Sequence, residues 1–445
     1  MDYRENYYAW LNHPNLTDEE RNNLKSLTDQ EIKDAFYTDV QFGTAGMRGL
    51  MGLGPNRLNI YTIRKATQGY ANYLKKNNLN KVAIAYDNRY NSRDFAYDCA
   101  ALLASNGITT YLFDSLRPTP ELSYTVRYYK CDGGIMITAS HNPKQYNGYK
   151  LYDETGCQLI PTIAAKVIEE VNAIDNPLDI KPAEDYDKTL INIVNKEVDD
   201  AYLKDVASIQ LRKDVDKNFK IAFSPEHGTS YLPVMNSLKN AGYDVYEVKS
   251  QSVFDPAFSA TKTPNPEEPG AYEEVLKLAK DIDAKLLLVC DPDGDRMGVG
   301  VKHNGEYVVL NGNQTGALLL EYILSTNEEL GIKVDKANST VNRYMATLST
   351  VLSIAVKEYG WLDENPMLKV VKKKEPHGRV RFLDDKQIPR LLSECLKQSN
   401  ELYLCVLIAL STGARYSEIL NLSWVFTKFS RIPKAEITNR LGMKP

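Results

Sequence analysis

Short apolar runs that read as β-strands alternate with segments of helical periodicity, and this alternation limits the possible folds more than any other feature of the chain. Val82–Tyr86 reads as a strand, Ser92–Asn106 as a helix and Thr109–Phe113 as the next strand. A second cycle places strands at Lys220–Phe223 and Asp244–Val248. Strands that alternate with helices build α/β domains. The sequence therefore predicts consecutive α/β domains.

A polar loop follows the apolar run Gly133–Ile137, which we predict to be a strand. The loop reads Thr138-Ala139-Ser140-His141-Asn142-Pro143. Open α/β sheets place their ligands beyond the carboxyl ends of strands. Ser140 has a hydroxyl that can carry phosphate, and His141 and Lys150 supply donors or acid/base groups nearby. On local chemistry alone, a capped loop without catalytic function is the alternative.

An acidic loop follows the apolar run Leu286–Cys290 and reads Asp291-Pro292-Asp293-Gly294-Asp295-Arg296. Three carboxylates at alternate positions can point to one side, and Mg²⁺ takes such oxygen ligands while keeping positions open for a phosphate. A solvated acidic turn is the alternative. The loop is not an EF-hand, because the later ligands and the final bidentate glutamate are absent. We predict a metal site at Asp291, Asp293 and Asp295.

Together these segments resemble the α-D-phosphohexomutase family of phosphoglucomutases and phosphomannomutases. Four motifs occur in the family's order: the amino-terminal active-site loop at Phe42–Gly49, the phosphoserine loop at Thr138–Pro143, the Gly-x-Lys acid/base segment at Asn147–Lys150 and the metal loop at Asp291–Arg296. Four motifs in order are far more specific than any one of them. The resemblance covers residues 1 to roughly 330.

The resemblance implies an isomerase that moves a phosphoryl group within a hexose phosphate substrate, through a phosphoserine at Ser140. It assigns catalytic roles to Ser140, His141, Lys150 and Arg48. It places Mg²⁺ on Asp291, Asp293, Asp295 and a phosphoserine oxygen of Ser140. It gives phosphate binding to Arg48 and Arg296, and it implies glucose 1,6-bisphosphate as activator.

Charge divides the chain into an acidic and a basic part. Residues 336–445 contain 18 Lys and Arg against 10 Asp and Glu, a net +8, and residues 1–335 contain 36 against 48, a net −12. An acidic body suits a metabolic enzyme, whereas a basic segment suits contact with nucleic acid. We therefore expect two modules with different partners.

The secondary-structure pattern also changes in the basic part. Past Ile332, apolar residues keep helical spacing and no strand-like runs alternate with them. Thr340–Pro366 and Phe382–Trp424 resemble the phage-integrase type of tyrosine recombinase. The resemblance matches Arg415 to the first catalytic arginine, which would contact a DNA phosphate. The later lysine, the His-x-x-Arg segment and the nucleophilic tyrosine do not follow. The alternative function is therefore a DNA-binding fusion related to recombinases, without strand cleavage.

We predict six segments from these observations. They are a helical leader at 1–38, phosphohexomutase domain I at 39–190, domain II at 191–302, the start of a truncated domain III at 303–335, an all-α recombinase-like segment at 336–424 and a short basic tail at 425–445. The resemblance implies that loops in later parts of domain III and in domain IV bind the sugar and the phosphate farther from the serine. Their loss makes a fusion of fragments without full turnover a third hypothesis.

Cysteine usage and hydropathy indicate the compartment. The six cysteines show no Cys-x-x-Cys spacing, which is typical of thiols in a reducing cytosol. The amino terminus lacks a signal pattern, and the apolar run near Leu404–Leu410 is too short to span a bilayer. We expect a cytoplasmic protein without a membrane partner.

Overall fold

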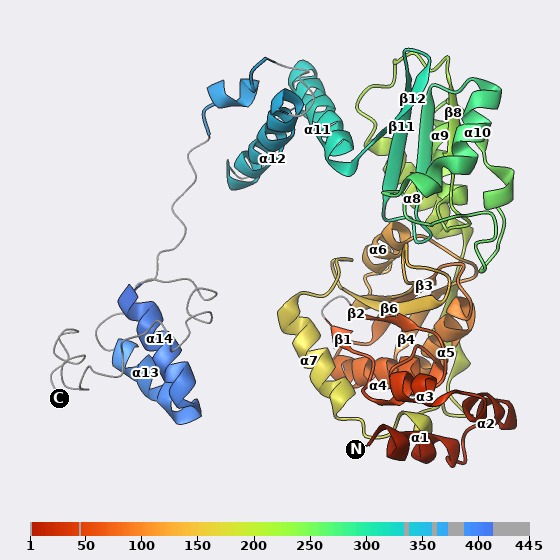
Figure 1. Cartoon of the computed structure of the whole chain (residues 1–445), viewed down its shortest axis with the longest axis vertical. Helices are drawn as coiled ribbons and strands as arrows, with labels where there is room; N and C mark the ends of the chain where they lie inside the picture. Colours follow the sequence, from red (N-terminus) through yellow and green to blue (C-terminus); the bar gives the residue numbers. More distant parts are fainter. Residues whose placement is uncertain (1, 44–45, 333–337, 358–362, 373–386, 413–445) are drawn as a thin grey trace. The chain divides into compact units, whose positions relative to one another are not determined.

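The computed structural model describes residues 2–43, 46–332, 338–357, 363–372 and 387–412 (Figure 1). The chain clusters into two compact units. The first unit contains both β-sheets of the described residues, and strands alternate with helices in it, as the sequence predicts. The second contains α13 (Gln387–Gln398) and α14 (Asn400–Thr412), which pack against each other.

The first three helices are short and capped. They are α1 (Tyr3–Leu11), α2 (Asp18–Lys25) and α3 (Asp29–Phe36). Thr17 and Thr28 each accept a hydrogen bond from the third residue of their helix, whose glutamate side chain reaches back to the cap. Both helices thus begin at a threonine capping box within the predicted helical leader. Trp10 and Phe36 pack with Tyr61 of the next helix, so these helices rest on the first sheet domain.

The first sheet has seven strands in the order β1-β2-β6-β5-β3-β4-β7. Its strands are β1 (Phe42–Gly43), β2 (Gly46–Leu50), β3 (Lys81–Tyr86), β4 (Thr109–Phe113), β5 (Gly133–Ile137), β6 (Tyr146–Asp153) and β7 (Ile191–Val194). Neighbours among β5, β3, β4 and β7 are parallel, and β1, β2 and β6 run antiparallel to their neighbours. The predicted strands at β3, β4 and β5 are confirmed.

Helices cover both faces of this sheet. One face packs against α4 (Ile60–Lys76), α5 (Ser92–Ser105) and α7 (Pro161–Asn172), and the other against α6 (Thr119–Tyr128) and α8 (Lys196–Ser208). On β3, Val82 and Ile84 enter the first core and Ala83 and Ala85 enter the second. A strand buried on both faces must be apolar at every position, which explains the unbroken apolar runs in the sequence.

The second sheet has five strands in the order β12-β11-β10-β8-β9. They are β8 (Lys220–Ser224), β9 (Asp244–Glu247), β10 (Leu286–Cys290), β11 (Met297–His303) and β12 (Glu306–Leu310). α9 (Tyr231–Asn240) packs on one face and α10 (Glu273–Ile282) on the other. β10, β8 and β9 are parallel, so the carboxyl ends of β8 and β10 lie at the same edge.

Strand β12 belongs to this second sheet, although it lies in the segment 303–335 that we predict to be the start of domain III. β12 pairs antiparallel with β11, with Val299 opposite Leu310. Asn304 and Gly305 both have positive φ, at 50° and 86°. A two-residue turn with two positive φ angles joins tight hairpins. The turn therefore folds β12 back onto β11 before the helical part begins.

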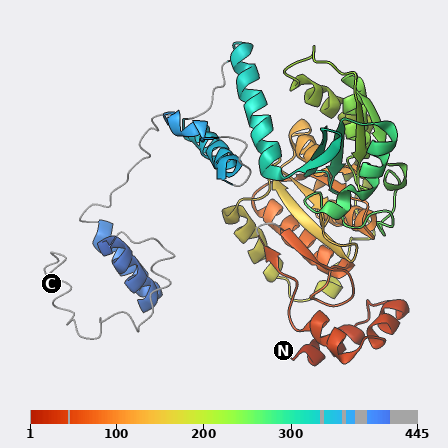
Figure 2. The same cartoon turned by 45° about the horizontal axis from the view of Figure 1, so that its top comes forward.

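The helices after β12 are α11 (Gly312–Glu329) and α12 (Asn338–Lys357). Asn311 caps α11 by accepting a hydrogen bond from Gln314. α11 is the long teal helix in Figure 2, and Leu318 and Leu319 on it are exposed. Short 3₁₀ helices occur at Pro177–Asp179, Lys188–Leu190, Lys249–Gln251, Pro269–Tyr272 and Pro366–Lys369. Within the described residues, no helix combines the length and apolar character that crossing a bilayer requires.

Candidate active site

The serine loop and the acidic loop meet in the structure. Ser140 lies just beyond β5 and Asp291 directly follows β10, each at the carboxyl end of a parallel strand. The Ser140 hydroxyl donates a hydrogen bond to Asp291 Oδ2 at 2.8 Å. Both side chains are buried. Two sheets thus bring together residues 151 positions apart in the chain, at the edges where α/β sheets place ligands.

Ser140 adopts a backbone conformation that is uncommon for residues other than glycine. Its φ is 52°, and its N–H donates to the Thr138 hydroxyl at 2.8 Å. Left-handed backbone at a non-glycine residue has an energetic cost and persists where surrounding contacts hold it. It occurs here at the residue predicted to carry the phosphate.

Arg89, which lies outside the residues predicted to form the site, provides those contacts. The buried guanidinium donates to four carbonyl oxygens of the serine loop: Ser140 and Asn142 at 2.6 Å each, Pro143 at 2.9 Å and Tyr146 at 3.0 Å. Asp87 forms an ion pair with Arg89 at 3.2 Å. The only sequence clue to this role is that Arg89 lies three residues after Tyr86, the last residue of the buried strand β3. Arg89 fixes the loop by its backbone and leaves the side chains of Ser140 and His141 free for chemistry.

The acidic loop holds three carboxylates close together. Single oxygens of Asp291, Asp293 and Asp295 lie within 4.8 Å of one another, and Asp291 and Asp293 are buried. Asp293 Oδ1 is buried without a hydrogen-bond partner. Burial, and then the charges of Asp293 and Asp295, raise the pKa of Asp291. This donor set fits a divalent cation, because a cation would neutralise the repulsion and take up the unpartnered oxygen.

Lys150 on β6 lies against the acidic loop. Its Nζ is 2.7 Å from Asp293 Oδ2 and 3.4 Å from Asp295 Oδ2. Burial lowers the pKa of Lys150, but the charges of Asp293 and Asp295 outweigh burial, so the net pKa is raised. Lys150 is therefore protonated in this arrangement and can donate a proton or a hydrogen bond.

Two further segments support the acidic loop. Thr119, the first residue of α6, donates to Asp293 through its N–H, at 2.8 Å to the carbonyl, and its hydroxyl, at 3.1 Å to Oδ2. The loop 225–229 packs against the acidic loop so closely that a Cβ at Gly228 would lie 2.6 Å from Pro292 Cα. Only glycine fits that approach. No local pattern in the sequence predicts these contacts.

The other predicted residues lie around this centre. His141 Nδ1 is 3.3 Å from the Ser140 hydroxyl, and burial, then Arg296 and Arg48, lower the pKa of His141. Arg48 donates to Asn142 Oδ1 at 2.7 Å. Arg296 is exposed, with Asp295 and Glu267 at 4.0 and 3.9 Å. A cavity of about 670 Å³ opens between His141 and residues 257–265. It can admit a ligand next to the serine.

The structure thus brings eight of the nine predicted site residues into one region. Ser140, Lys150, Asp291 and Asp293 are linked by direct contacts, whereas Arg48 reaches the serine loop through Asn142. Arg415 lies outside the described residues. The catalytic and binding roles of all nine remain predictions.

Comparisons with known proteins agree with this architecture. The family models for phosphoglucomutase/phosphomannomutase α/β/α domain I and domain II match residues 39–178 and 200–305. A Staphylococcus epidermidis phosphoglucomutase is 40% identical over 308 residues, 68% of this chain and 56% of the relative. A Staphylococcus aureus phosphoglucomutase is 34% identical over 397 residues, 85% of this chain and 71% of the relative. This chain belongs to the phosphoglucomutase/phosphomannomutase family.

A solved structure shows the same fold. A phosphoglucomutase/phosphomannomutase family protein from Burkholderia thailandensis matches with a TM-score of 0.53 and 19% identity, over 65% of this chain and 60% of that chain. The chain spans little more than half the length of the Staphylococcus epidermidis relative. None of these similarities supports the recombinase resemblance of residues 338–424 or the predicted contact with nucleic acid.

Proposed function

We propose that this protein carries out phosphoryl transfer of the phosphohexomutase type, between Ser140 and the hydroxyls of a hexose phosphate. The observation that carries the proposal is the contact of the Ser140 hydroxyl with Asp291 while Lys150 contacts Asp293. It places a nucleophile, an acidic cluster and a cation at one point, which are the parts that phosphoryl transfer requires.

Asp291, Asp293 and Asp295 would hold Mg²⁺ in this proposal, together with a phosphoserine oxygen. The unpartnered, buried Oδ1 of Asp293 supports a resident cation there. When bound, Mg²⁺ neutralises charge on a transferring phosphoryl group.

The chain's own residues then have separate tasks. The P–O bond to Ser140 breaks as a sugar oxygen forms a new bond to phosphorus. The serine oxygen keeps the electron pair of the broken bond and takes up the proton that the sugar hydroxyl loses. Protonated Lys150, which contacts Asp293, would stabilise that oxygen or donate a proton to a leaving group. His141, at 3.3 Å from the hydroxyl, would orient it or exchange its proton. Arg48 and Arg296 would bind the substrate's phosphate.

The substrate class and the phosphoryl source follow from the family. The relatives named phosphoglucomutase support glucose phosphates as first candidates, with glucose 1,6-bisphosphate as the compound that phosphorylates Ser140. The chain covers only 56% of the Staphylococcus epidermidis relative. Complete catalytic turnover by this chain is therefore also a proposal.

Peptide mass spectrometry of the purified full chain tests the proposal. Incubation with glucose 1,6-bisphosphate and Mg²⁺ should add one phosphate to Ser140, and excess glucose 1-phosphate should remove it. Ser140→Ala should carry none, and Asp291→Asn should be labelled far more slowly. A folded protein that stays unphosphorylated under these conditions would contradict the proposal.

A further inference from the structure

The two oxygens of the Asp293 carboxylate have different surroundings. Oδ2 accepts hydrogen bonds from Lys150 Nζ at 2.7 Å and from the Thr119 hydroxyl at 3.1 Å. Oδ1 is buried and has no hydrogen-bond partner among the residues that the structure describes. Buried carboxylate oxygens are nearly always paired, so Oδ1 is the oxygen that is left for a cation. Protein groups thus hold one oxygen of Asp293 and leave the other available.

The Asp291 carboxyl also lies close to Asp293. The two acids are near enough to share a hydrogen bond when one of them is protonated. A cation between them would replace that proton, because its charge neutralises both carboxylates. The contact between the two acids therefore belongs to the proposed metal site, and it provides no permanent donor to Asp293.

Thr119 comes from the domain of the first sheet and is fixed beside Asp293 by more than its hydroxyl. It is the first residue of α6, and its N–H donates to the Asp293 carbonyl at 2.8 Å. Pro118, the residue before it, packs so closely on the acidic loop that a Cβ at Gly294 would lie 2.9 Å from Pro118 Cβ. Thr119 and Asp293 are both buried. The Thr119 hydroxyl therefore has little freedom to leave Oδ2.

We propose that Thr119 is a positioning residue that makes Asp293 a one-oxygen ligand and thereby favours Mg²⁺ over Ca²⁺ at the acidic loop. This inference rests on the cation site of the proposed function. Mg²⁺ requires near-octahedral coordination and keeps several waters, whereas Ca²⁺ takes more oxygens and accepts bidentate carboxylates. With Oδ2 bound to Thr119 and Lys150, Asp293 offers Oδ1 alone. Hydrogen bonds to the ligands of a metal orient them and change metal affinity.

Isothermal titration calorimetry of the full chain with MgCl₂ and, separately, with CaCl₂ tests this assignment. Thr119→Val removes the hydroxyl and keeps the N–H that holds the Asp293 carbonyl. The variant should bind Mg²⁺ about tenfold more weakly, because the carboxylate can turn and no longer presents Oδ1 alone. Its affinity for Ca²⁺ should stay within about twofold of the wild-type value, since Ca²⁺ accepts both oxygens.

Two more substitutions at this position separate the hydroxyl from the packing of the side chain. Thr119→Ser retains the hydroxyl and should keep the wild-type preference for Mg²⁺ over Ca²⁺. Thr119→Ala lacks the hydroxyl and should behave as Thr119→Val does, although it leaves a different volume at this position. The opposite result for these two variants would overturn the assignment to the hydroxyl.

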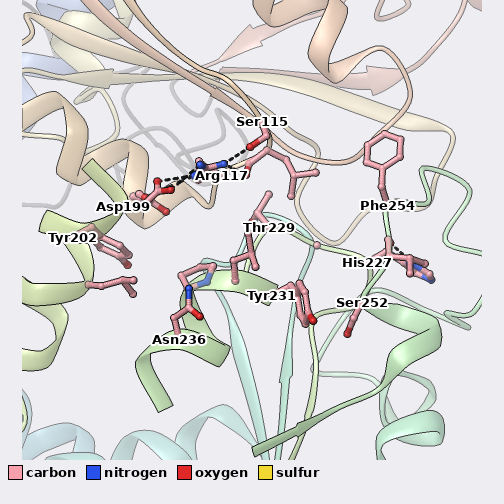
Figure 3. A pocket seen from close by; sticks show the side chains of 17 residues that line it. Ser115, Arg117, Asp199, Tyr202, His227, Thr229, Tyr231, Asn236, Ser252 and Phe254 are labelled. Carbon is pink, nitrogen blue, oxygen red and sulfur yellow. Dashed lines mark hydrogen bonds and ion pairs between the residues drawn. The ribbon is translucent and has the colours of Figure 1, made fainter. Parts of the chain in front are cut away.

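Thr229→Val is the matched control at the same loop. Thr229 is buried, and its N–H and hydroxyl both donate to the Pro292 carbonyl, at 2.9 and 3.0 Å. It lines a cavity of about 290 Å³ that none of the three aspartates of the acidic loop lines (Figure 3). Thr229 thus supports the backbone of the loop rather than a carboxylate oxygen. Thr229→Val should leave the ratio of Mg²⁺ to Ca²⁺ affinity unchanged, even where it lowers the stability of the loop.

The titrations distinguish a failure of the cation site from a failure of the role of Thr119. If the wild type binds neither ion, the proposed cation site is wrong and this inference is overturned with it. If the wild type binds Mg²⁺ and Thr119→Val keeps the wild-type ratio of affinities, only the role of Thr119 is overturned. An equal fall in both affinities, or the same change of ratio in Thr229→Val, would show that Thr119 supports the fold of the loop without selecting an oxygen of Asp293.

Discussion

The serine loop and the acidic loop occupy corresponding positions beyond parallel strands, but side chains of different kinds hold them in place. The serine loop is fixed from within by Arg89, a buried cation that donates to four of its carbonyl oxygens. The acidic loop carries three close carboxylates and is supported by Thr119 and by the loop 225–229. An arginine keeps its charge at any physiological pH. The charge that holds the serine loop therefore does not change over the physiological pH range.

The support of the acidic loop contains a titratable acid instead. Glu226 is fully buried in the loop that packs on Pro292, where Ser224 and Gln251 donate to its carboxyl. Burial is the largest effect on Glu226 and raises its pKa to about 7. We therefore expect the fold to preorganise the serine loop at any physiological pH, and the acidic loop to respond to pH and to a bound cation.

Removing Arg89 should produce the largest effect. Arg89→Met leaves four carbonyls without their donor and Asp87 without its ion-pair partner, so the free energy of unfolding should fall by about 3–5 kcal/mol. Urea denaturation at pH 7 measures this. Arg93→Met, at an exposed arginine over the Tyr97 ring, should cost less than about 1 kcal/mol. Similar losses in both variants would show that Arg89 does not hold the loop.

Glu226 should make stability pH-dependent. An acid whose folded pKa lies above its unfolded value of 4.5 binds its proton more tightly in the folded state. Its contribution is therefore fully present below pH 4.5 and is lost as the pH rises through 7. The loss amounts to ~3 kcal/mol. Between pH 4.5 and 7.5, the wild type should lose this stability relative to Glu226→Gln in urea denaturation.

Glu306→Gln, at an exposed glutamate of β12, controls for the loss of one acidic side chain. Parallel pH curves for the wild type and Glu226→Gln would refute the titration of Glu226. They would also remove the contrast between a permanently charged and a titratable support.

Much of the fold could be predicted from local patterns, and much of the site could be proposed from them. Strands such as β3 and β10 are buried on both faces, so they appear as apolar runs. The loops with Ser140 and Asp291 directly follow such runs. Their placement at sheet edges needs only the rule that ligands bind beyond the carboxyl ends of strands.

The remaining features depend on contacts between distant parts of the chain. Arg89 reaches carbonyl groups more than 50 residues away, and no local pattern encodes that contact. The pairing of β12 with β11 was not predicted, because the strand's own residues do not reveal its partner, whereas the turn at Asn304 and Gly305 does. The antiparallel strand β11 was missed because polar Lys302 and His303 and two glycines interrupt its apolar pattern.

A divalent cation should stabilise the acidic loop. Mg²⁺ that binds only the folded chain adds about 2.7 kcal/mol to the free energy of unfolding at 100 times its dissociation constant. A Mg²⁺ titration of the melting temperature should show this gain in the wild type and lose it in Asp291→Asn. Asp283→Asn, at an exposed aspartate with φ of 58°, is the matched control and should respond as the wild type does. A gain that survives in Asp291→Asn would place the cation elsewhere.

Arg296, which ends the acidic loop, should contribute least to stability and still affect phosphoryl transfer. The Arg296 side chain is 42% exposed, and its acidic neighbours lie at 3.9 and 4.0 Å, so Arg296→Gln should change the free energy of unfolding by less than about 0.5 kcal/mol. Phosphate binding through a guanidinium does not require a role in folding. Arg296→Gln should therefore slow the removal of phosphate from Ser140 by glucose 1-phosphate, measured by mass spectrometry, without changing the urea midpoint. If Arg296→Gln is as stable and as active as the wild type, Arg296 contributes neither to folding nor to phosphate binding. Phosphate binding would then rest on Arg48, which lies beside the serine loop.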